Sequence, residues 1–302
     1  MLKNKTIKPY RLNKEWHFYA FISPWMIGFF AFIVLPMLFS LYAAFTRWNG
    51  VTFPTFTGLS NFIFMFTRDD LFWLSIRNTL YYTFVSVPLN LFLAFLLATV
   101  LNKRLPGSNF FRAAFYLPSV LAGVAIFITW IWLFSPATGL INTILYFLGI
   151  TGPRWLQDPA TAMPSLILMN VTTLGGGMLI MLAGLQNIPE EYYESARIDG
   201  ANPLQALLHI TLPGISPVIF YNLLMGIITS LQVFVQPFVM TDGGPMRATY
   251  VYGIHLYFTA FRYMDFGYAS TLAWMLFILI LGLSLIIFKT SKLWVYYGGE
   301  TQ

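Results

Sequence analysis

The chain has 302 residues, of which 58% are hydrophobic and only 9% are charged. A soluble domain is usually about 25% charged, so this composition, with its long apolar runs, predicts an integral membrane protein. There is no cysteine, which excludes disulfides and thiolate metal sites. The net charge of +6 is small, and we interpret it as a sign of membrane topology, not of nucleic-acid binding.

The first 17 residues are polar and basic, and a long apolar stretch follows them. This stretch, from Phe18 to about Phe45, is much longer than the apolar core of a cleavable signal peptide. A helix needs about 20 apolar residues to cross a bilayer core of about 30 Å. Six segments reach this length, at roughly 18–45, 79–101, 110–134, 164–186, 215–239 and 266–288.

These segments lack the ten-residue alternation of barrel strands, so we expect an all-α integral membrane fold with six transmembrane helices. Six spans place both termini on one side. If the N-terminus is inside, all seven lysines and eleven of the seventeen basic residues fall on inside segments. We therefore predict a cytoplasmic N-terminal segment (1–17), a transmembrane domain (18–288) and a cytoplasmic tail (289–302).

The remaining charged residues suggest no chemistry of their own. Asp69 and Asp70 are adjacent in a predicted external turn and are expected to be solvated. His17, His209 and His255 are scattered, without a second ligand at metal spacing. The chain has no GxxxxGK[ST] loop, so it is not expected to hydrolyse ATP. No Asp, Glu, Lys or Arg lies near the centre of a predicted span, which disfavours a proton- or sodium-coupled carrier.

The longest polar run between two apolar segments is 188–213, which holds four of the eleven acidic residues. We expect a helix to begin at Pro189 and to end at Gly200 in the left-handed conformation. A second short helix, residues 204–210, is expected to be stopped by Pro213 before the next span. Composition alone is equally compatible with an amphipathic loop on the membrane surface and with a docking element.

The same run resembles the EAA signature of bacterial ABC importer permeases. The matching residues are Glu194, Ala196, Gly200, Ile210, Leu212 and Pro213, with Ser195 in place of the usual alanine. The resemblance extends to the binding-protein-dependent carbohydrate permeases of the maltose, multiple-sugar and glycerol-phosphate type. It includes residues 78–98, GLSNF at 58–62, GLINTIL at 139–145, TDGGP at 241–245 and FGYASTLAW at 266–274.

This resemblance implies that 188–213 is a cytoplasmic coupling loop whose helix inserts into an ATPase subunit. Glu194 would pair with a basic residue of the ATPase, and Gly200 would permit the corner. The implied coupling residues are Glu194, Ser195, Ala196, Gly200, Ile210, Leu212 and Pro213. The implied partners are a second homologous permease, two ATPase subunits that hold ATP and magnesium, and an extracytoplasmic sugar-binding protein, all at a bacterial plasma membrane. The chain itself is expected to hold no cofactor or metal, to bind no nucleic acid and to be no enzyme.

Uncharged polar residues recur in the fourth and fifth predicted spans. In the fifth, the face from Asn222 through Val233 to Gln236 is expected to lie on one helix. Amides and hydroxyls suit a sugar, but they also bond neighbouring membrane helices, and both roles stay open. The resemblance favours Asn170, Thr173, Thr229 and Ser230, which match sugar-site positions of maltose-type permeases. The candidate substrate path is Asn170, Thr173, Asn222, Gly226, Thr229, Ser230 and Gln236.

The triple glycine at 175–177 suggests close packing or a hinge. The sequence as a whole predicts the permease subunit of an ATP-driven, binding-protein-dependent sugar importer, with an oligosaccharide as substrate. An importer permease for a polyamine, phosphate or amino acid is the first alternative, and a carrier or channel that works alone is the second. No cluster of a nucleophile, a general base or metal ligands is evident, so the sequence does not support a membrane enzyme.

Overall fold

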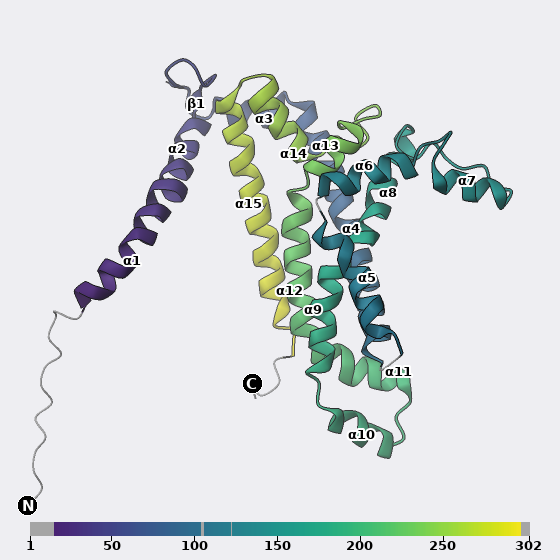
Figure 1. Cartoon of the computed structure of the whole chain (residues 1–302). Coiled ribbons are helices and arrows are strands. Elements are labelled where there is room, and N and C mark those ends of the chain that lie inside the picture. The colour runs from purple at the N-terminus through teal and green to yellow at the C-terminus, as the bar shows by residue number, and fades with distance from the viewer. Residues whose placement is uncertain (1–14, 104–105, 122, 297–302) are drawn as a thin grey trace, which may run out of the picture.

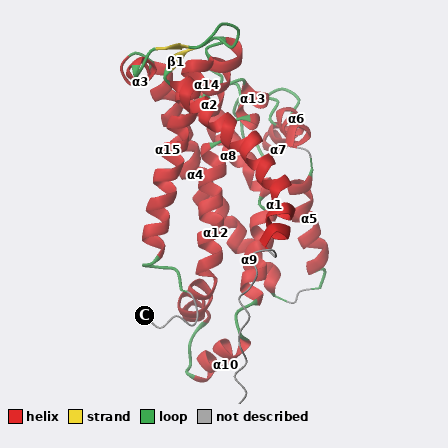
Figure 2. Ribbon diagram, turned by 90° about the vertical axis from the view of Figure 1, so that its left-hand side faces the viewer, coloured by secondary structure: helices red, strands yellow, loops and turns green. Residues whose placement is uncertain are grey.

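The computed structural model describes residues 15–103, 106–121 and 123–296. Long helices dominate it and run between two opposite ends of the molecule (Figures 1 and 2). In the described residues the strands are limited to an antiparallel pair, β1 (Thr46–Arg47) and β2 (Thr55–Phe56). The expected helical fold is confirmed. The predicted segments 1–17 and 289–302 lie largely and partly outside the described residues, respectively.

Four helical stretches are long and apolar enough to cross a bilayer by themselves, namely Trp16–Ala44, Asp70–Asn102, Pro203–Leu231 and Phe266–Ser291. Two further stretches reach this length only as bent pairs. The first joins α5 (Ser108–Val120) to α6 (Gly123–Leu133) at 100°, and the second joins α8 (Pro159–Asn170) to α9 (Gly175–Gln186) at 48°. By length and composition, the described part of the chain therefore has four helices that could cross a membrane, or up to six if each bent pair is one span.

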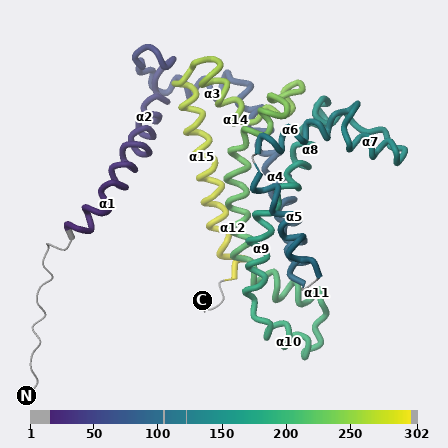
Figure 3. Tube along the Cα trace, viewed as in Figure 1, coloured from purple at the N-terminus to yellow at the C-terminus, as the bar shows by residue number. Residues whose placement is uncertain are grey.

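The first stretch leans away from the bundle, so that its α1 part stands apart from the other helices (Figures 1 and 3). It consists of α1 (Glu15–Phe29), the π-helical turn η2 (Phe30–Val34) and α2 (Leu35–Ala44). In the apolar 18-residue part of this stretch, only 6% of the residues are buried. Its contact with α15 (Phe266–Ser291) includes a hydrogen bond from Trp274 Nε1 to Ser40 Oγ, at 3.2 Å.

The centre of the bundle is formed by α4 (Asp70–Asn102), α9 and α12 (Leu212–Leu231), which share a buried apolar core. Gly175 brings α9 against the backbone of α5, because a Cβ there would lie 2.3 Å from the Phe115 carbonyl oxygen. At Gly176 a Cβ would meet nothing within 4 Å. Gly175 therefore has the close-packing role expected for the triple glycine.

The predicted fifth span, 215–239, is wrong as a single helix. The α12 helix ends at Leu231, and α13 (Val235–Thr241) begins after a break. Pro237 supplies the physical reason, because its ring would clash with the carbonyl of residue 233 in a continuous helix. The first turn of α13 accommodates the same proline.

The expected stop at Pro213 is also wrong. Helical structure continues from α11 (Pro203–Ala206) through the π-helical turn η4 (Leu207–Thr211) into α12. The Leu212 N–H bonds to the Leu207 carbonyl across this wider turn. The proline follows directly, in the first turn of α12, and the helix runs on without a break.

The end of the bundle that carries β1 is closed by short elements. They are α3 (Ser60–Thr67), α14 (Tyr252–Tyr257) and the π-helical turn η5 (Phe258–Arg262). Their buried side chains, with those of α4 and α15, form an apolar cluster of Met65, Phe72, Tyr252, Tyr268 and Leu272. A further helix, α7 (Leu140–Phe147), projects to the side at this end (Figure 1). We call this the outer end and the opposite one the inner end.

Candidate functional site

A cavity of about 390 Å³ lies between α4, α12 and the bent segment formed by α8, the 3-10 turn η3 (Val171–Thr173) and α9. Pockets for small ligands have volumes of about 300 to 1,000 Å³, so the cavity falls in that range. None of the described residues that line it is charged. The polar lining residues are Tyr82, Ser86, Asn90, Asn170, Thr173, Asn222, Thr229 and Ser230.

Six of the seven residues predicted for the substrate path line this cavity, namely Asn170, Thr173, Asn222, Gly226, Thr229 and Ser230. The seventh, Gln236, is buried on α13 outside the lining. Because α12 ends at Leu231, neither Gln236 nor Val233 continues the helical face of Asn222, and that expectation is corrected.

Gln236 reaches the cavity wall through a hydrogen-bond network. The Tyr82 hydroxyl donates to Gln236 Oε1 at 2.7 Å and accepts from Asn170 Nδ2 at 2.6 Å. Gln236 Nε2 donates to the Leu166 carbonyl at 2.8 Å. The network joins α4, α8 and α13, and a network that is fully satisfied in this way holds its members rigidly. It therefore fixes the wall that Tyr82 and Asn170 form.

The other polar side chains present acceptor oxygens to the cavity. The hydroxyls of Thr173, Thr229 and Ser230 donate to carbonyls of their own helices, which leaves oxygen lone pairs free. Asn222 Nδ2 likewise donates to a backbone carbonyl, at 3.0 Å, and Asn90 Oδ1 is buried without a partner. The wall is therefore suited to a neutral ligand that donates many hydrogen bonds.

One point on this wall was missed by the sequence analysis, and another bears on the packing role that it left open. Tyr82, Ser86 and Asn90 were missed, although their spacing of four residues places them on one face of a helix. Gly226 has a packing role, because a Cβ there would lie 3.1 Å from Val87 Cγ1. It lets α12 approach α4 closely.

The predicted coupling loop lies at the inner end, where α10 (Glu190–Ile198) is the most distant helix (Figures 1 and 2). Gly200 has φ +77°, which confirms the left-handed conformation expected at the end of this helix. Asn202 then caps α11 through a reciprocal capping box with Gln205. A hydrogen bond of 3.0 Å between the hydroxyls of Tyr193 and Thr211 ties α10 to η4.

The coupling loop is exposed and hollowed. Glu194, Ser195 and Gly200 are exposed, Ala196, Ile210, Leu212 and Pro213 are half-buried, and Ile198 is 86% exposed. A hollow of about 850 Å³ beside the loop is lined in part by Ser195, Ala196, Ile210 and Pro213. Tyr192 and Leu204 of the same loop are also exposed, and large exposed apolar side chains that gather on one surface are typical of an interaction site.

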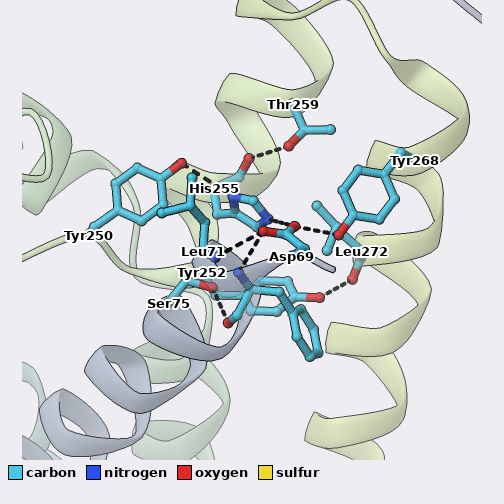
Figure 4. Close-up of polar contacts among 10 residues, drawn as sticks. Asp69, Leu71, Ser75, Tyr250, Tyr252, His255, Thr259, Tyr268 and Leu272 are labelled. Carbon is cyan, nitrogen blue, oxygen red and sulfur yellow. Dashed lines mark hydrogen bonds and ion pairs between the residues drawn. The ribbon is translucent and has the colours of Figure 1, made fainter. Parts of the chain in front are cut away.

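Asp69, expected to be solvated, is instead buried at the outer end (Figure 4). Its Oδ1 accepts from the backbone N–H groups of Leu71 and Phe72 and so caps α4. Its Oδ2 lies 2.9 Å from His255 Nε2 and also accepts from the Tyr268 hydroxyl. The carboxylate therefore ties α4 to α14 and α15. Asp70, the next residue, is exposed as expected.

His255 completes this tie as a neutral ring. Burial lowers the pKa of the imidazole, and the Asp69 carboxylate opposes that shift only in part. The ring donates from Nε2 to Asp69, and its Nδ1 accepts from Tyr250, 3.2 Å away. Burial raises the pKa of Tyr250 to about 12, so this hydroxyl keeps its proton. Among the described residues no group of three His, Cys, Asp or Glu side chains could hold a metal ion, and we assign this cluster a structural role.

The chain is similar to known transport proteins along most of its length. It is 43% identical over 288 residues to the probable ABC transporter permease protein YesP of Bacillus subtilis, covering 94% of this chain and 93% of the relative. It is 33% identical to the trehalose/maltose transport system permease protein MalF of Thermococcus litoralis, covering 91% and 93%.

One solved structure with the same fold is a bacterial alginate ABC transporter in complex with an alginate pentasaccharide-bound periplasmic protein. The TM-score is 0.82 at 24% identity, covering 93% of this chain and 95% of the other. The family model for the binding-protein-dependent transport system inner membrane component matches residues 86–291. The chain therefore belongs to the family of binding-protein-dependent transport system inner membrane components.

Proposed function

We propose that the chain is the permease subunit of an ATP-driven importer and forms half of the translocation path for a neutral oligosaccharide. The observation that carries this proposal is the uncharged cavity between α4, α9 and α12, whose free oxygens suit sugar hydroxyls. Support also comes from the relatives, which include a trehalose/maltose permease and an arabinooligosaccharide permease.

Charged solutes are the alternative to a neutral sugar. A charge that enters an apolar environment needs a partner, and the cavity lining supplies none. The fold neighbour comes from a transporter for the acidic polysaccharide alginate. Its 24% identity supports the shared fold, but not a shared substrate.

In this proposal each bent helix pair is one span, which makes six spans within 18–288. Both termini and the coupling loop 188–213 then lie in the cytoplasm. A second homologous permease would pair with this chain, and the exposed apolar surface of α1 and α2 supports such a partner. An extracytoplasmic sugar-binding protein would deliver the substrate to the outer end.

The proposed coupling to ATP hydrolysis runs through α10. Two cytoplasmic ATPase subunits would hold ATP and magnesium, and one of them would receive α10 in a cleft. Glu194 would fix the orientation of α10 by pairing with a basic residue of the ATPase, and Gly200 would form the corner at the end of α10. Ser195, Ala196, Ile210 and Pro213 would provide a small-residue surface for close contact, and Leu212 would support it from the start of α12.

The substrate is tested in the complete complex, reconstituted in liposomes with its binding protein. A neutral oligosaccharide should stimulate ATP hydrolysis, and an oligouronate of the same length should not. Asn90→Leu should reduce this stimulation, because it removes an unpartnered acceptor from the cavity. Thr99→Val on the same helix lies outside the lining and serves as the control. Stimulation by the oligouronate alone would contradict the sugar assignment.

Coupling is tested by charge reversal on α10. Glu194→Lys should abolish co-purification of the ATPase, whereas Glu191→Lys, also exposed on α10, should retain it. Equal retention by both variants would remove Glu194 from the proposed contact. Uptake by this chain alone, in liposomes without any ATPase, would instead support the stand-alone carrier.

A further inference from the structure

A second cavity, of about 770 Å³, opens at the inner end and is lined by basic side chains. The ends of α4 and α9 form its wall together with α5 and α10. Lys103, Arg112 and Arg197 line it, with Glu190 as the one carboxylate of the lining. The function proposed above makes no use of this cavity.

Among the described residues, the three cations have no carboxylate within ion-pair distance. In the part of the chain that the structure describes, the one side-chain ion pair joins His255 to Asp69 at the outer end. Arg112 Nη2 donates to the Leu101 carbonyl at 3.0 Å, but its Nε is buried and has no hydrogen-bond partner within the described part of the chain. A buried donor without an acceptor is unfavourable by about 1 to 3 kcal/mol, so the cavity lacks an acceptor group beside Arg112.

Helix dipoles account for only part of this arrangement. The carboxyl ends of α4 and α9 attract positive charge, and the bond from Arg112 to Leu101 fits that explanation. It leaves the Nε of Arg112 unexplained. It also does not explain why Arg197 of α10, a separate helix, lines the same cavity. Convergence of cations from several elements indicates an anionic ligand.

We propose that this cavity binds a phosphate group, and that the phosphate belongs to the headgroup of an anionic phospholipid. The guanidinium groups suit phosphate because their N–H donors match its oxygens in pairs. Large apolar side chains are exposed near the cations in sequence, with Val100 on α4 51% exposed and Phe110 on α5 72% exposed. Such surfaces suit acyl chains, and basic pockets between membrane helices are known to bind lipid headgroups.

The bound headgroup would link two parts of the chain. Arg112 belongs to a membrane helix, whereas Arg197 belongs to α10. A hydrogen bond between the side chains of Tyr193 and Thr211 connects α10 to η4. A phosphate between the two arginines would hold α10 against the bundle. This inference does not depend on the transported substrate, and lipid retention is measured without transport.

The test compares two lysines at the same end of the bundle. The full chain is purified from mixed bilayers of phosphatidylglycerol and phosphatidylcholine with identical acyl chains, and native mass spectrometry counts the retained lipids. Phosphatidylglycerol should be retained preferentially. Lys103→Gln should weaken its retention about fivefold, as expected for one basic residue at a membrane surface. Lys289→Gln, which removes an exposed lysine outside the cavity, should leave retention unchanged.

Arg197→Gln repeats the test on an exposed side chain, and the unfolding temperature checks that this variant is folded. Inorganic phosphate, added in millimolar excess, should not displace the lipid. Equal retention of the two lipids, or equal losses in Lys103→Gln and Lys289→Gln, would overturn the site. Displacement by inorganic phosphate would overturn its assignment to a lipid, because it would show a site for a free anion.

Discussion

Polar side chains at the two ends of the helix bundle differ in whether they bond within the chain. At the outer end, Asp69 and His255 are nearly inaccessible and bond to each other and to neighbouring helices (Figure 4). At the inner end, Glu194 and Arg197 are exposed on α10 and have no ion-pair partner among the described residues. The difference indicates that the outer end is a structural frame whose polar groups bond to one another within the chain. The inner end instead presents a surface to other molecules.

The largest expected effect is the loss of the outer tie. Asp69→Ala removes the acceptor of four hydrogen bonds and leaves His255 and Tyr268 without their partner. It should lower the free energy of unfolding by about 3 kcal/mol, through the lost helix cap and the unsatisfied donors, measured by denaturant unfolding in detergent. Asp70→Ala is the matched control, because this neighbour is exposed, and should cost under about 1 kcal/mol. Similar losses in both variants would contradict the frame.

The second prediction tests whether close packing continues from the outer end toward the inner end. Gly175→Ala would place a methyl group against the backbone of α5 and should cost about 2 kcal/mol of unfolding free energy. Gly176→Ala meets open space and should be neutral or slightly stabilising. If the two adjacent substitutions behave alike in unfolding, α5 is not packed against α9 in this way.

At the inner end we expect a small effect on stability and a large one on transport. Gly200→Val imposes left-handed strain of about 1 to 2 kcal/mol on a residue with no atoms near its Cβ position. The bundle should unfold almost as before, whereas uptake by the assembled importer should be lost. Gly200→Asn should retain uptake, because asparagine tolerates this conformation. Equal uptake by the two variants would show that the corner is unimportant.

The smallest expected effect is a pH dependence of the outer tie. Burial holds the pKa of His255 below its ordinary value of 6.5, so the unfolded chain takes up this proton first as the pH falls. Stability should therefore decrease as the pH falls below about 6.5 and level off below the folded pKa. Unfolding temperatures measured across this window should show a weaker decrease in His255→Gln. The same substitution at exposed His209 should keep the wild-type slope.

The sequence predicts local features of this molecule better than long-range ones. Apolar length located the helices, and the chemistry of glycine located the corner at Gly200. Five of the six cavity residues were found as uncharged polar side chains inside spans, and the resemblance to maltose-type permeases favoured four of them. Asp69 was missed because its partner His255 lies 186 residues away, and adjacent acids in a turn are usually solvated.

Hydropathy also says nothing about the direction of a helix. The segments 110–134 and 164–186 are each apolar enough to suggest one straight span, yet the structure bends them by 100° and 48°. Pro237 indicates the break before α13 in the sequence, but the apolar residues around it favoured the prediction of one continuous span. Gln236 was consequently placed on the wrong face, although its bond to Tyr82 still connects it to the cavity wall.

The early end of α12 gives the cavity an electrical polarity. Thr229 and Ser230, which line the cavity, belong to the last turn of this helix, which ends at Leu231. The final carbonyls of a helix lack bonds to a following turn and carry a partial negative charge. That charge repels anions and attracts the hydrogens of hydroxyl groups. In the function proposed above, this partial charge would favour a neutral sugar over an acidic one without any ionised side chain.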